Sequence, residues 1–229
     1  MAIKSVYLPR TDKVGVEIKR LTYEYYAGHS ISQKRKSINS LKRAAQKQGA
    51  NNFLEVSSKS DNKLGVALSA FNLKFRTVKH KQLLIVENAF QASKVFEHGG
   101  PYNDLLFVSP REAKQDPRLK TSGKLIKFHF FGKDYPNHPQ TFFYDWLYIN
   151  ALIKNQNLYL KVLDYDCFSD IEFNENKSIN CQAYSLAMFV SIKKNGIDIK
   201  SLKDKDVFLN ICYAEYESRE KETFRNFFA

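Results

Sequence analysis

Hydrophobic and polar residues alternate along the segment 84–96 with the period of an α-helix, and they predict a single helix across it. One line of that helix is apolar, the opposite line carries Glu87, Gln91 and Lys94, and both flanks are largely apolar. A helix that is apolar around most of its circumference is usually buried, which would place its polar line along a cavity. Buried charges are costly unless they are paired, so this line is a candidate site. The alternative is that the polar line is the solvent face of an ordinary amphipathic helix.

The remaining pattern predicts an α+β fold in which helices predominate and the β component is small. Alternating residues up to about residue 28 indicate short strands, and the segments 53–56 and 64–75 favour strand or extended structure. Helical spacing and capping residues predict helices over 37–48, from Ser109 to about Asp116, over 141–155 and over 178–195, with a loop over 132–139. We find no repeat, low-complexity block or linker, so one domain spanning 1–229 is the simplest account.

A chain of 229 residues with 43% hydrophobic and 14% aromatic residues is long enough and apolar enough for one sizeable core. It has no apolar run near the roughly 20 residues of a membrane-spanning helix, and no hydrophobic signal region at its N-terminus. We therefore expect a cytoplasmic protein with no membrane association. Cys167, Cys181 and Cys212 are odd in number and widely spaced, which argues against a disulfide framework and against a cysteine-rich zinc site.

Charge adds a preference for anionic partners. The 36 Lys and Arg against 24 Asp and Glu leave a net charge of +12, which favours polyanions through long-range steering and counterion release. The excess is densest over 34–47 and again over 76–81, where Phe71 and Phe75 lie close by, as in proteins that stack single-stranded bases. Solubility alone is the other explanation for such a charge. The sequence therefore indicates a nearby anion without identifying it.

Several common catalytic motifs are absent from the sequence. The pair Gly123-Lys124 lacks the upstream glycines of a phosphate-binding loop, no two histidines have metal-binding helix spacing, and no Gly-x-Ser-x-Gly turn occurs. The usual kinase, dehydrogenase, zinc-hydrolase and serine-hydrolase interpretations therefore lose support. Acid–base or amine chemistry from carboxylates and lysines remains, and we expect neither a metal nor a cofactor.

The segment 87–94, Glu-Asn-Ala-Phe-Gln-Ala-Ser-Lys, is similar to the Glu-His-x-Phe-Gln-Ala-x-Lys signature helix of the NADAR family, named for NAD and ADP-ribose metabolism. The preceding Leu-Ser-Ala-Phe of 68–71 resembles a second segment of that family. Beyond the general family, the chain resembles the branch found beside DarT-type toxins, which attach ADP-ribose to guanine in DNA. The resemblance covers about residues 33–190. Its branch-like segments are 33–38, 54–60, 94–102, 143–148, 168–173 and 177–183.

This resemblance implies a single-domain NADAR fold and an antitoxin enzyme that reverses the modification made by its cognate toxin. The enzyme would hydrolyse the N-glycosidic bond between ADP-ribose and guanine in DNA and release ADP-ribose, with single-stranded DNA favoured by the need to reach the base. Cleavage makes C1 of the ribose oxocarbenium-like, and a nearby carboxylate stabilises that charge or activates water. Glu87 is the first candidate, with Asp170 or Glu172 as the second carboxylate. Lys94 would steady the ribose or pyrophosphate, or would attack the ring-opened sugar as an amine.

Other residues of the same segments are candidate substrate contacts. Ser57, Ser58 and Lys59 form a donor-rich turn suited to a pyrophosphate, or merely a solvated loop. Trp146 and Phe71 are candidates for stacking on a base, although a lone Trp on a helical stripe is more often part of a core. The remaining candidates are the amides Gln91, Asn180 and Gln182 for ribose hydroxyls and base edges, the carboxylate Asp145, and Ser69 and Tyr102.

Two other functions fit the same residues. More distant NADAR relatives cleave N-glycosidic bonds in small phosphorylated riboflavin intermediates, but the basic segments and the toxin-associated segments speak against that substrate. A non-catalytic protein could instead read ADP-ribosylated DNA or neutralise the toxin by sequestration. Replacing Glu87 by Gln separates catalysis from sequestration, because only catalysis requires the carboxylate.

Overall fold

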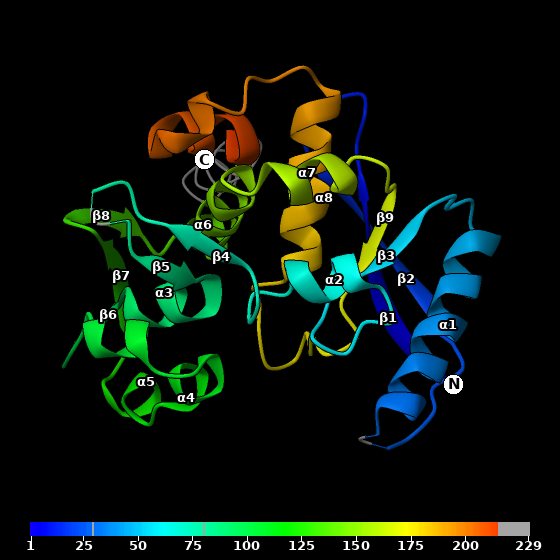
Figure 1. Ribbon diagram of the computed structural model, residues 1–229, viewed down its shortest axis with the longest axis horizontal. Helices are drawn as coiled ribbons and strands as arrows, with labels where there is room; N and C mark the ends of the chain where they lie inside the picture. The colour runs from blue at the N-terminus through cyan, green and yellow to red at the C-terminus, as the bar shows by residue number, and fades with distance from the viewer. Residues whose placement is uncertain (29, 80, 215–229) are drawn as a thin grey trace, which may run out of the picture.

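A four-stranded sheet in the order β2-β1-β9-β3 forms one side of the molecule in the computed structural model, which describes residues 1–28, 30–79 and 81–214 (Figure 1). β1 (Ala2–Pro9) pairs antiparallel with β2 (Val16–Tyr23) over its full length. β9 (Cys167–Ser169) lies between β1 and β3 (Phe53–Glu55), antiparallel to the first and parallel to the second. Helix α1 (Ile31–Lys47) packs on this sheet through Ile38, Leu41 and Ala45.

The opposite side holds two smaller antiparallel sheets (Figure 1). β4 (Lys74–Arg76) pairs with β5 (Leu83–Ile85), and β7 (Leu125–Phe130) lies between β6 (Lys94–Phe96) and β8 (Lys133–Pro136). Short helices surround them: α3 (Val86–Ala92), the 3-10 helix Asn103–Phe107, α4 (Pro110–Gln115) and α5 (Arg118–Thr121). Other helical segments are α2 (Lys63–Leu68), α7 (Gln156–Val162), the 3-10 helix Ser201–Lys203 and residues 205–214.

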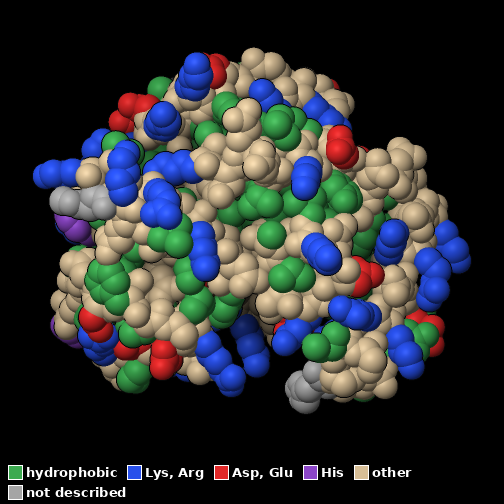
Figure 2. All heavy atoms as spheres, viewed as in Figure 1, with side chains coloured by type: hydrophobic (Ala, Val, Ile, Leu, Met, Phe, Trp, Pro, Cys, Tyr) green, Lys and Arg blue, Asp and Glu red, His purple; other side chains and the backbone are tan. Residues whose placement is uncertain are grey.

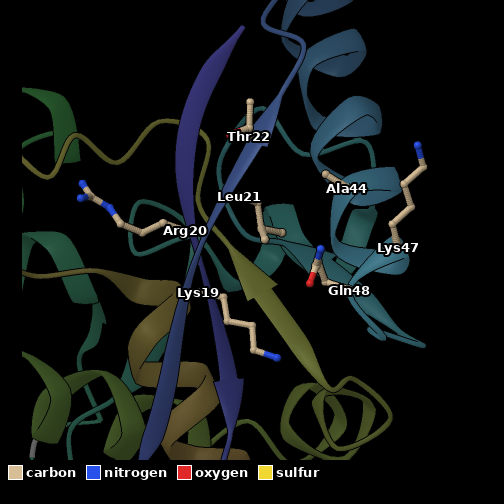
Figure 3. A pocket seen from close by; sticks show the side chains of 7 residues that line it. All are labelled: Lys19, Arg20, Leu21, Thr22, Ala44, Lys47 and Gln48. Atoms are coloured by element: carbon tan, nitrogen blue, oxygen red, sulfur yellow. The ribbon is translucent and has the colours of Figure 1, made fainter.

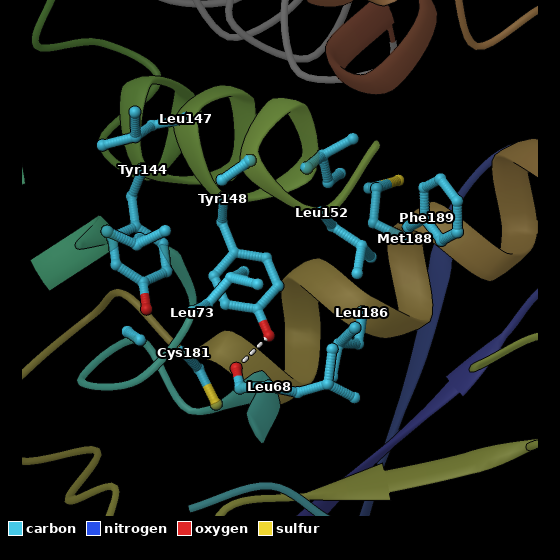
Figure 4. Packing of buried hydrophobic residues seen from close by; sticks show 14 of the residues in the cluster. Leu68, Leu73, Tyr144, Leu147, Tyr148, Leu152, Cys181, Leu186, Met188 and Phe189 are labelled. Carbon is cyan, nitrogen blue, oxygen red and sulfur yellow. Dashed lines mark hydrogen bonds between the residues drawn. The ribbon is translucent and has the colours of Figure 1, made fainter. Parts of the chain in front are cut away.

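The main hydrophobic core lies between the two sides, around α6 (Phe142–Ile153) and α8 (Gln182–Lys194). Both helices are apolar on most of their circumference, and this is why they run through the interior rather than over the surface. Tyr148 of α6 is fully buried, and its Oη donates a hydrogen bond of 2.5 Å to the Leu68 carbonyl oxygen (Figure 4). Within the described residues, no helix is both long enough and apolar enough to span a bilayer.

The prediction of one helix over 84–96 is wrong at both ends, because only the centre of this segment is helical. Its first two residues belong to β5, the helix α3 covers Val86–Ala92, and its last three residues form β6. Lys94 pairs with Phe128, a partner more than thirty residues away that a local pattern does not reveal. The prediction that helices predominate over a small β component is likewise not confirmed, because strands in three separate sheets accompany the helices in the described part of the chain.

Other element boundaries also differ from the sequence expectations. The segment 64–75 begins as helix α2, because the Asn62 side chain accepts a hydrogen bond from the Leu64 N–H. The segment 132–139 contains β8, because Phe131 and Gly132 both have positive φ and close a tight hairpin with β7. Helix α8 begins at Gln182 rather than at Ser178, and α1 begins at Ile31 rather than at Ser37.

Candidate active site

A cleft of about 900 Å³ opens between α3, α4 and α5 on one side and the loops that follow β3 and β9 on the other. This volume lies within the usual range for small-molecule sites. Figure 2 shows the hollow at the lower edge of the molecule, with Lys and Arg side chains on both walls. The cationic lining residues are Lys59, Lys94, Arg111, Lys114, Lys120 and Lys177, and the anionic ones are Glu87, Asp170 and Glu172.

Helix α3 contributes Glu87 and Gln91, one turn apart, to the floor of the cleft. Both are buried, at 5% and 6% exposure, so the polar line of the helix borders a cavity and is not a solvent face. The Gln91 amide nitrogen donates to a Glu87 carboxylate oxygen over 2.8 Å and orients it. The Gln91 Oε1 atom is buried without a hydrogen-bond partner among the described residues. Since buried acceptors normally have partners, this oxygen is suited to receive a ligand hydroxyl.

Lys94 reaches the same cleft from β6, and therefore not from the helical face on which its position relative to Glu87 was predicted. Its Nζ lies 4.8 Å from the centre of the Phe90 ring. Burial lowers the pKa of Lys94 to about 8, a shift that Lys114 reinforces and the Glu87 carboxylate opposes. A minor but larger than usual fraction of Lys94 is therefore a neutral amine near physiological pH.

Asp170 follows β9 directly and forms the opposite wall. Its Oδ1 accepts hydrogen bonds from the backbone N–H groups of Glu172 and Phe173 at 2.9 and 3.1 Å, and its Oδ2 accepts one from the Gln182 amide at 2.9 Å. Burial raises the pKa of Asp170 to about 6, although Lys4 and these hydrogen bonds work in the opposite direction. The carboxyl group is thus held in a fixed orientation and titrates close to neutral pH.

Glu172 is placed differently from Asp170. It lies on the rim, 39% of its side chain is exposed, and it forms a 2.9 Å ion pair with Lys34 of α1. An exposed, paired carboxylate is poorly suited to acid–base work on a buried bond. Of the two carboxylates offered by the sequence, Asp170 is the one inside the cleft.

Gln182 joins three segments around the cleft instead of presenting a free amide. Its Oε1 accepts from the Ala70 N–H at 2.6 Å, while its Nε2 donates to the Val56 carbonyl at 2.6 Å and to Asp170 at 2.9 Å. Because its polar atoms are occupied, Gln182 positions the site and is not free to read a base edge, as the sequence had suggested. Asn180 retains that option, since its Oδ1 is buried without a partner among the described residues.

The rim supplies polar groups and one half-buried aromatic ring. Ser57 is buried and its Oγ accepts from the Lys59 N–H at 3.1 Å, which forms a tight turn directly after β3. Lys114 of α4 places its Nζ 5.2 Å from the centre of the half-buried Phe71 ring. The arrangement sets positive charge beside a flat apolar surface, a combination suited to a nucleotide.

Three predicted site residues lie away from the cleft, so their proposed ligand roles are withdrawn. Asp145 is buried and accepts 2.5 Å hydrogen bonds from Ser185 and Tyr213, which ties α6 to α8. Trp146 packs with its ring centre 4.7 Å from that of Tyr135, in the aromatic core. Tyr102 contacts the Ser122 hydroxyl at 2.5 Å and lies under the Arg118 guanidinium. The predicted residues that do line the cleft are Ser57, Ser58, Lys59, Ser69, Phe71, Glu87, Gln91, Lys94, Asp170, Glu172, Asn180 and Gln182.

Tyr144 is a cleft residue that the sequence interpretation missed. It comes from α6, packs edge-on against Phe90 with ring centres 5.0 Å apart, and lines the cleft. Burial and the carboxylates Glu87 and Asp170 all raise the pKa of its hydroxyl, so Tyr144 stays protonated between two acids. It stands beside Asp145 and Trp146 in a segment that resembles the family, but the pattern does not reveal which helical face points to the cleft.

Within the described residues, no group of three or more His, Cys, Asp or Glu side chains could hold a metal ion. No curated protein matches the chain. The profile of a family described as "DarT1-associated NADAR antitoxin" matches residues 2–222, which is almost the whole chain and more than the 33–190 covered by recognisable motifs. The chain therefore belongs to the DarT1-associated NADAR antitoxin family.

Proposed function

We propose that the protein is an N-glycosidase that removes ADP-ribose from guanine in DNA modified by a DarT-type toxin. One observation carries the proposal: Glu87 of α3, Lys94 of β6 and Asp170 of the loop after β9 line one cleft of about 900 Å³. Cleavage of a glycosidic bond uses one carboxylate to stabilise the charge on C1 and a second to activate water, and the cleft holds two buried carboxylates.

The residues divide the chemistry between them. As the bond between C1 of the ribose and the guanine nitrogen breaks, positive charge develops on C1, and the Glu87 carboxylate stabilises it from a site shielded from water. The departing guanine nitrogen takes up a proton from solvent, and a water oxygen then bonds to C1 to give free ADP-ribose. Asp170 takes the proton from that water, since its pKa of about 6 leaves it ionised at neutral pH.

Lys94 provides a covalent route to the same products. Its amine nitrogen bonds to C1 as the bond to guanine breaks, opening of the ribose ring converts the adduct to an imine, and water hydrolyses the imine to restore the amine. The lowered pKa of Lys94, about 8, supplies the neutral amine that this route needs. Borohydride added during turnover should trap a protein–ADP-ribose adduct that Lys94→Ala lacks. Absence of trapping during normal hydrolysis would instead assign Lys94 to charge stabilisation.

The cleft also fits the rest of the substrate. Its cationic rim complements a pyrophosphate, and the ring of Phe71 beside Lys114 offers a stacking surface for a base. A small phosphorylated riboflavin intermediate would use the same rim, but it would leave the basic surface outside the cleft without a role.

The decisive experiment compares oligonucleotides that carry ADP-ribose on guanine or on thymine, with products weighed by mass spectrometry. We expect release from guanine and little from thymine. Glu87→Gln should lower the guanine rate by about 10²–10⁴-fold with the protein still folded, and Glu24→Gln, an exposed acid outside the cleft, should not. Release from neither oligonucleotide would overturn the proposal. Full protection against the toxin by Glu87→Gln would favour sequestration.

A further inference from the structure

Helix α1 presents a basic surface that the proposed cleavage chemistry does not use. The helix contains six Lys or Arg residues and no Asp or Glu over Ile31–Lys47. Lys34 is paired with Glu172, and Lys36 lies over the Tyr26 ring. The other four cations are exposed and have no ion pair with any carboxylate among the described residues. These four, called here the α1 track, are Arg35, Lys42, Arg43 and Lys47.

The α1 track is a consequence of helical spacing. Ile38, Leu41 and Ala45 face the sheet, and this leaves the opposite side of the helix to solvent. Arg35 and Lys42 are seven residues apart and share one line, while Arg43 and Lys47 share the neighbouring line. The exposed Asn39 and Gln46 lie between them as additional hydrogen-bond donors. At 1.5 Å per residue, the track extends over roughly 18 Å.

One end of the track begins at the cleft. The 2.9 Å ion pair between Lys34 and Glu172 fixes the N-terminal half of α1 to the rim, and Glu172 lines the cleft itself. Figure 1 shows α1 running away from that edge along the outer side of the four-stranded sheet. A polymer leaving the cleft in this direction would therefore pass over the track.

The other end of the track enters a groove of about 560 Å³ between α1 and β2. Figure 3 shows Lys47 and Gln48 of the α1 end on one side of the groove and Lys19 of β2 on the other, and Leu21 and Ala44 also line it. Lys19 also lies 3.6 Å from Glu17. Arg20 points to the other side of the strand, where it pairs with Glu175 at 3.2 Å.

We propose that the α1 track and this groove bind the phosphate backbone of the DNA strand next to the modified nucleotide. The inference rests on the proposed function for the identity of the strand. A face made of Lys, Arg, Asn and Gln, without acidic side chains, matches the groups that contact DNA phosphates. A protein partner would be expected to meet a more mixed surface with aromatic or aliphatic anchors, and only Ile31 at the start of α1 is a large exposed apolar residue on this helix.

The test uses two variants of equal charge change. The first replaces Arg35, Lys42, Arg43 and Lys47 by Gln, which keeps the exposed positions polar and is a good helix former. The control replaces four exposed lysines outside both basic segments and outside the cleft, Lys124, Lys133, Lys194 and Lys200, by Gln. Binding of a fluorescent, unmodified single-stranded oligonucleotide is measured by anisotropy across salt concentrations, and hydrolysis is measured on the modified oligonucleotide and on ADP-ribosyl-guanosine alone.

We expect the track variant to raise the Kd for DNA about tenfold or more and to flatten its salt dependence by about 0.7 in slope for each phosphate that the protein no longer neutralises. Its kcat/KM should fall on the oligonucleotide and stay unchanged on ADP-ribosyl-guanosine. Equal weakening by the control variant, or an unchanged Kd in the track variant, overturns the inference while the proposed function stands. If the wild type releases ADP-ribose from neither substrate, the proposed function fails, and the binding comparison still decides whether the track binds DNA.

Discussion

At the scale of single residues, the two buried carboxylates of the cleft, Glu87 and Asp170, differ in how they are held. Glu87 receives one hydrogen bond from Gln91, whereas Asp170 receives three, two of them from the backbone. The backbone bonds fix Asp170 in the loop after β9, and burial still keeps its pKa at about 6. This difference allows the pair to carry out separate steps of one reaction.

The pH dependence of the reaction should report Asp170. If the ionised carboxylate is the base, kcat/KM falls about tenfold per pH unit below pH 6, because the protonated form is inactive. Rates measured from pH 4.5 to 9 on the modified oligonucleotide should show that limb. The Asp170→Asn variant should be slower, and its rate should no longer fall below pH 6. Any change of rate near pH 8 that comes from Lys94 should persist in this variant. A limb near pH 6 that survives in Asp170→Asn would assign it to another group.

Tyr144 and Tyr148 offer a matched pair on one helix, since both extend from α6 toward the same side (Figure 4). Tyr144→Phe keeps the ring contact with Phe90 and removes only the hydroxyl in the cleft, so we expect kcat to fall about 10–100-fold with an unchanged Tm. Tyr148→Phe removes the hydrogen bond to Leu68 and should cost about 1 kcal/mol of stability with little change in kcat. Steady-state kinetics and thermal melts of both variants check the contrast. The opposite pattern would exclude Tyr144 from the reaction.

At the scale of elements, local pattern predicted the centre of α3 and failed where distant partners decide the structure. The line Glu87–Gln91 was predictable because it lies within one continuous helix. Lys94 lines the same cleft as Glu87, but it does so from strand β6 and not from the predicted helix. The sequence pattern missed β6 because this strand forms only through its pairing with β7. The helix α2 was missed for a related reason: Gly65 permits a close approach to β3, where an added Cβ would lie 2.0 Å from the Glu55 carbonyl oxygen. Tertiary contacts of this kind leave no periodic signal.

Gln182, the first residue of α8, holds the Asp170 carboxylate in place through a hydrogen bond, and its substitution tests that role. Gln182→Ala should remove one of the hydrogen bonds to ionised Asp170, which raises the Asp170 pKa further and moves the acidic limb of the rate profile upward. The loss of a bond to a charged group should lower kcat/KM at pH 7 about tenfold. The pH profile distinguishes this from general destabilisation, which would lower activity without moving the limb. Gln46→Ala, on the exposed side of α1, is the control in the same assay.

At the scale of the whole molecule, the buried carboxyl groups link folding to pH. Burial raises the pKa of Glu55 to about 7 and of Asp145 and Asp170 to about 6. The Asp170 charge adds to the rise at neighbouring Glu55, whereas Asp145 lies apart, bonded to Ser185 of α8. Carboxyl groups with lowered pKa, such as Asp104, Asp116 and Asp134, are ionised in both folded and unfolded chains above pH 5. Between pH 5 and 7.5, the carboxyl groups with raised pKa therefore decide whether the free energy of unfolding rises or falls with pH.

A carboxyl group whose pKa is raised on folding binds more protons in the native state than in the unfolded chain, so its contribution to stability is lost as pH rises through the folded pKa. The free energy of unfolding should consequently fall from pH 5 to pH 7.5, by on the order of 1–3 kcal/mol per group as an upper limit. Urea denaturation at about 0.3 M salt, which screens long-range repulsion in this basic chain, measures this change. Asp145→Asn, remote from the cleft, should make the decline shallower by removing one titrating group that accepts bonds from Ser185 and Tyr213. A wild-type stability that rises over this interval would show that these carboxyl groups are solvated or compensated in the folded protein.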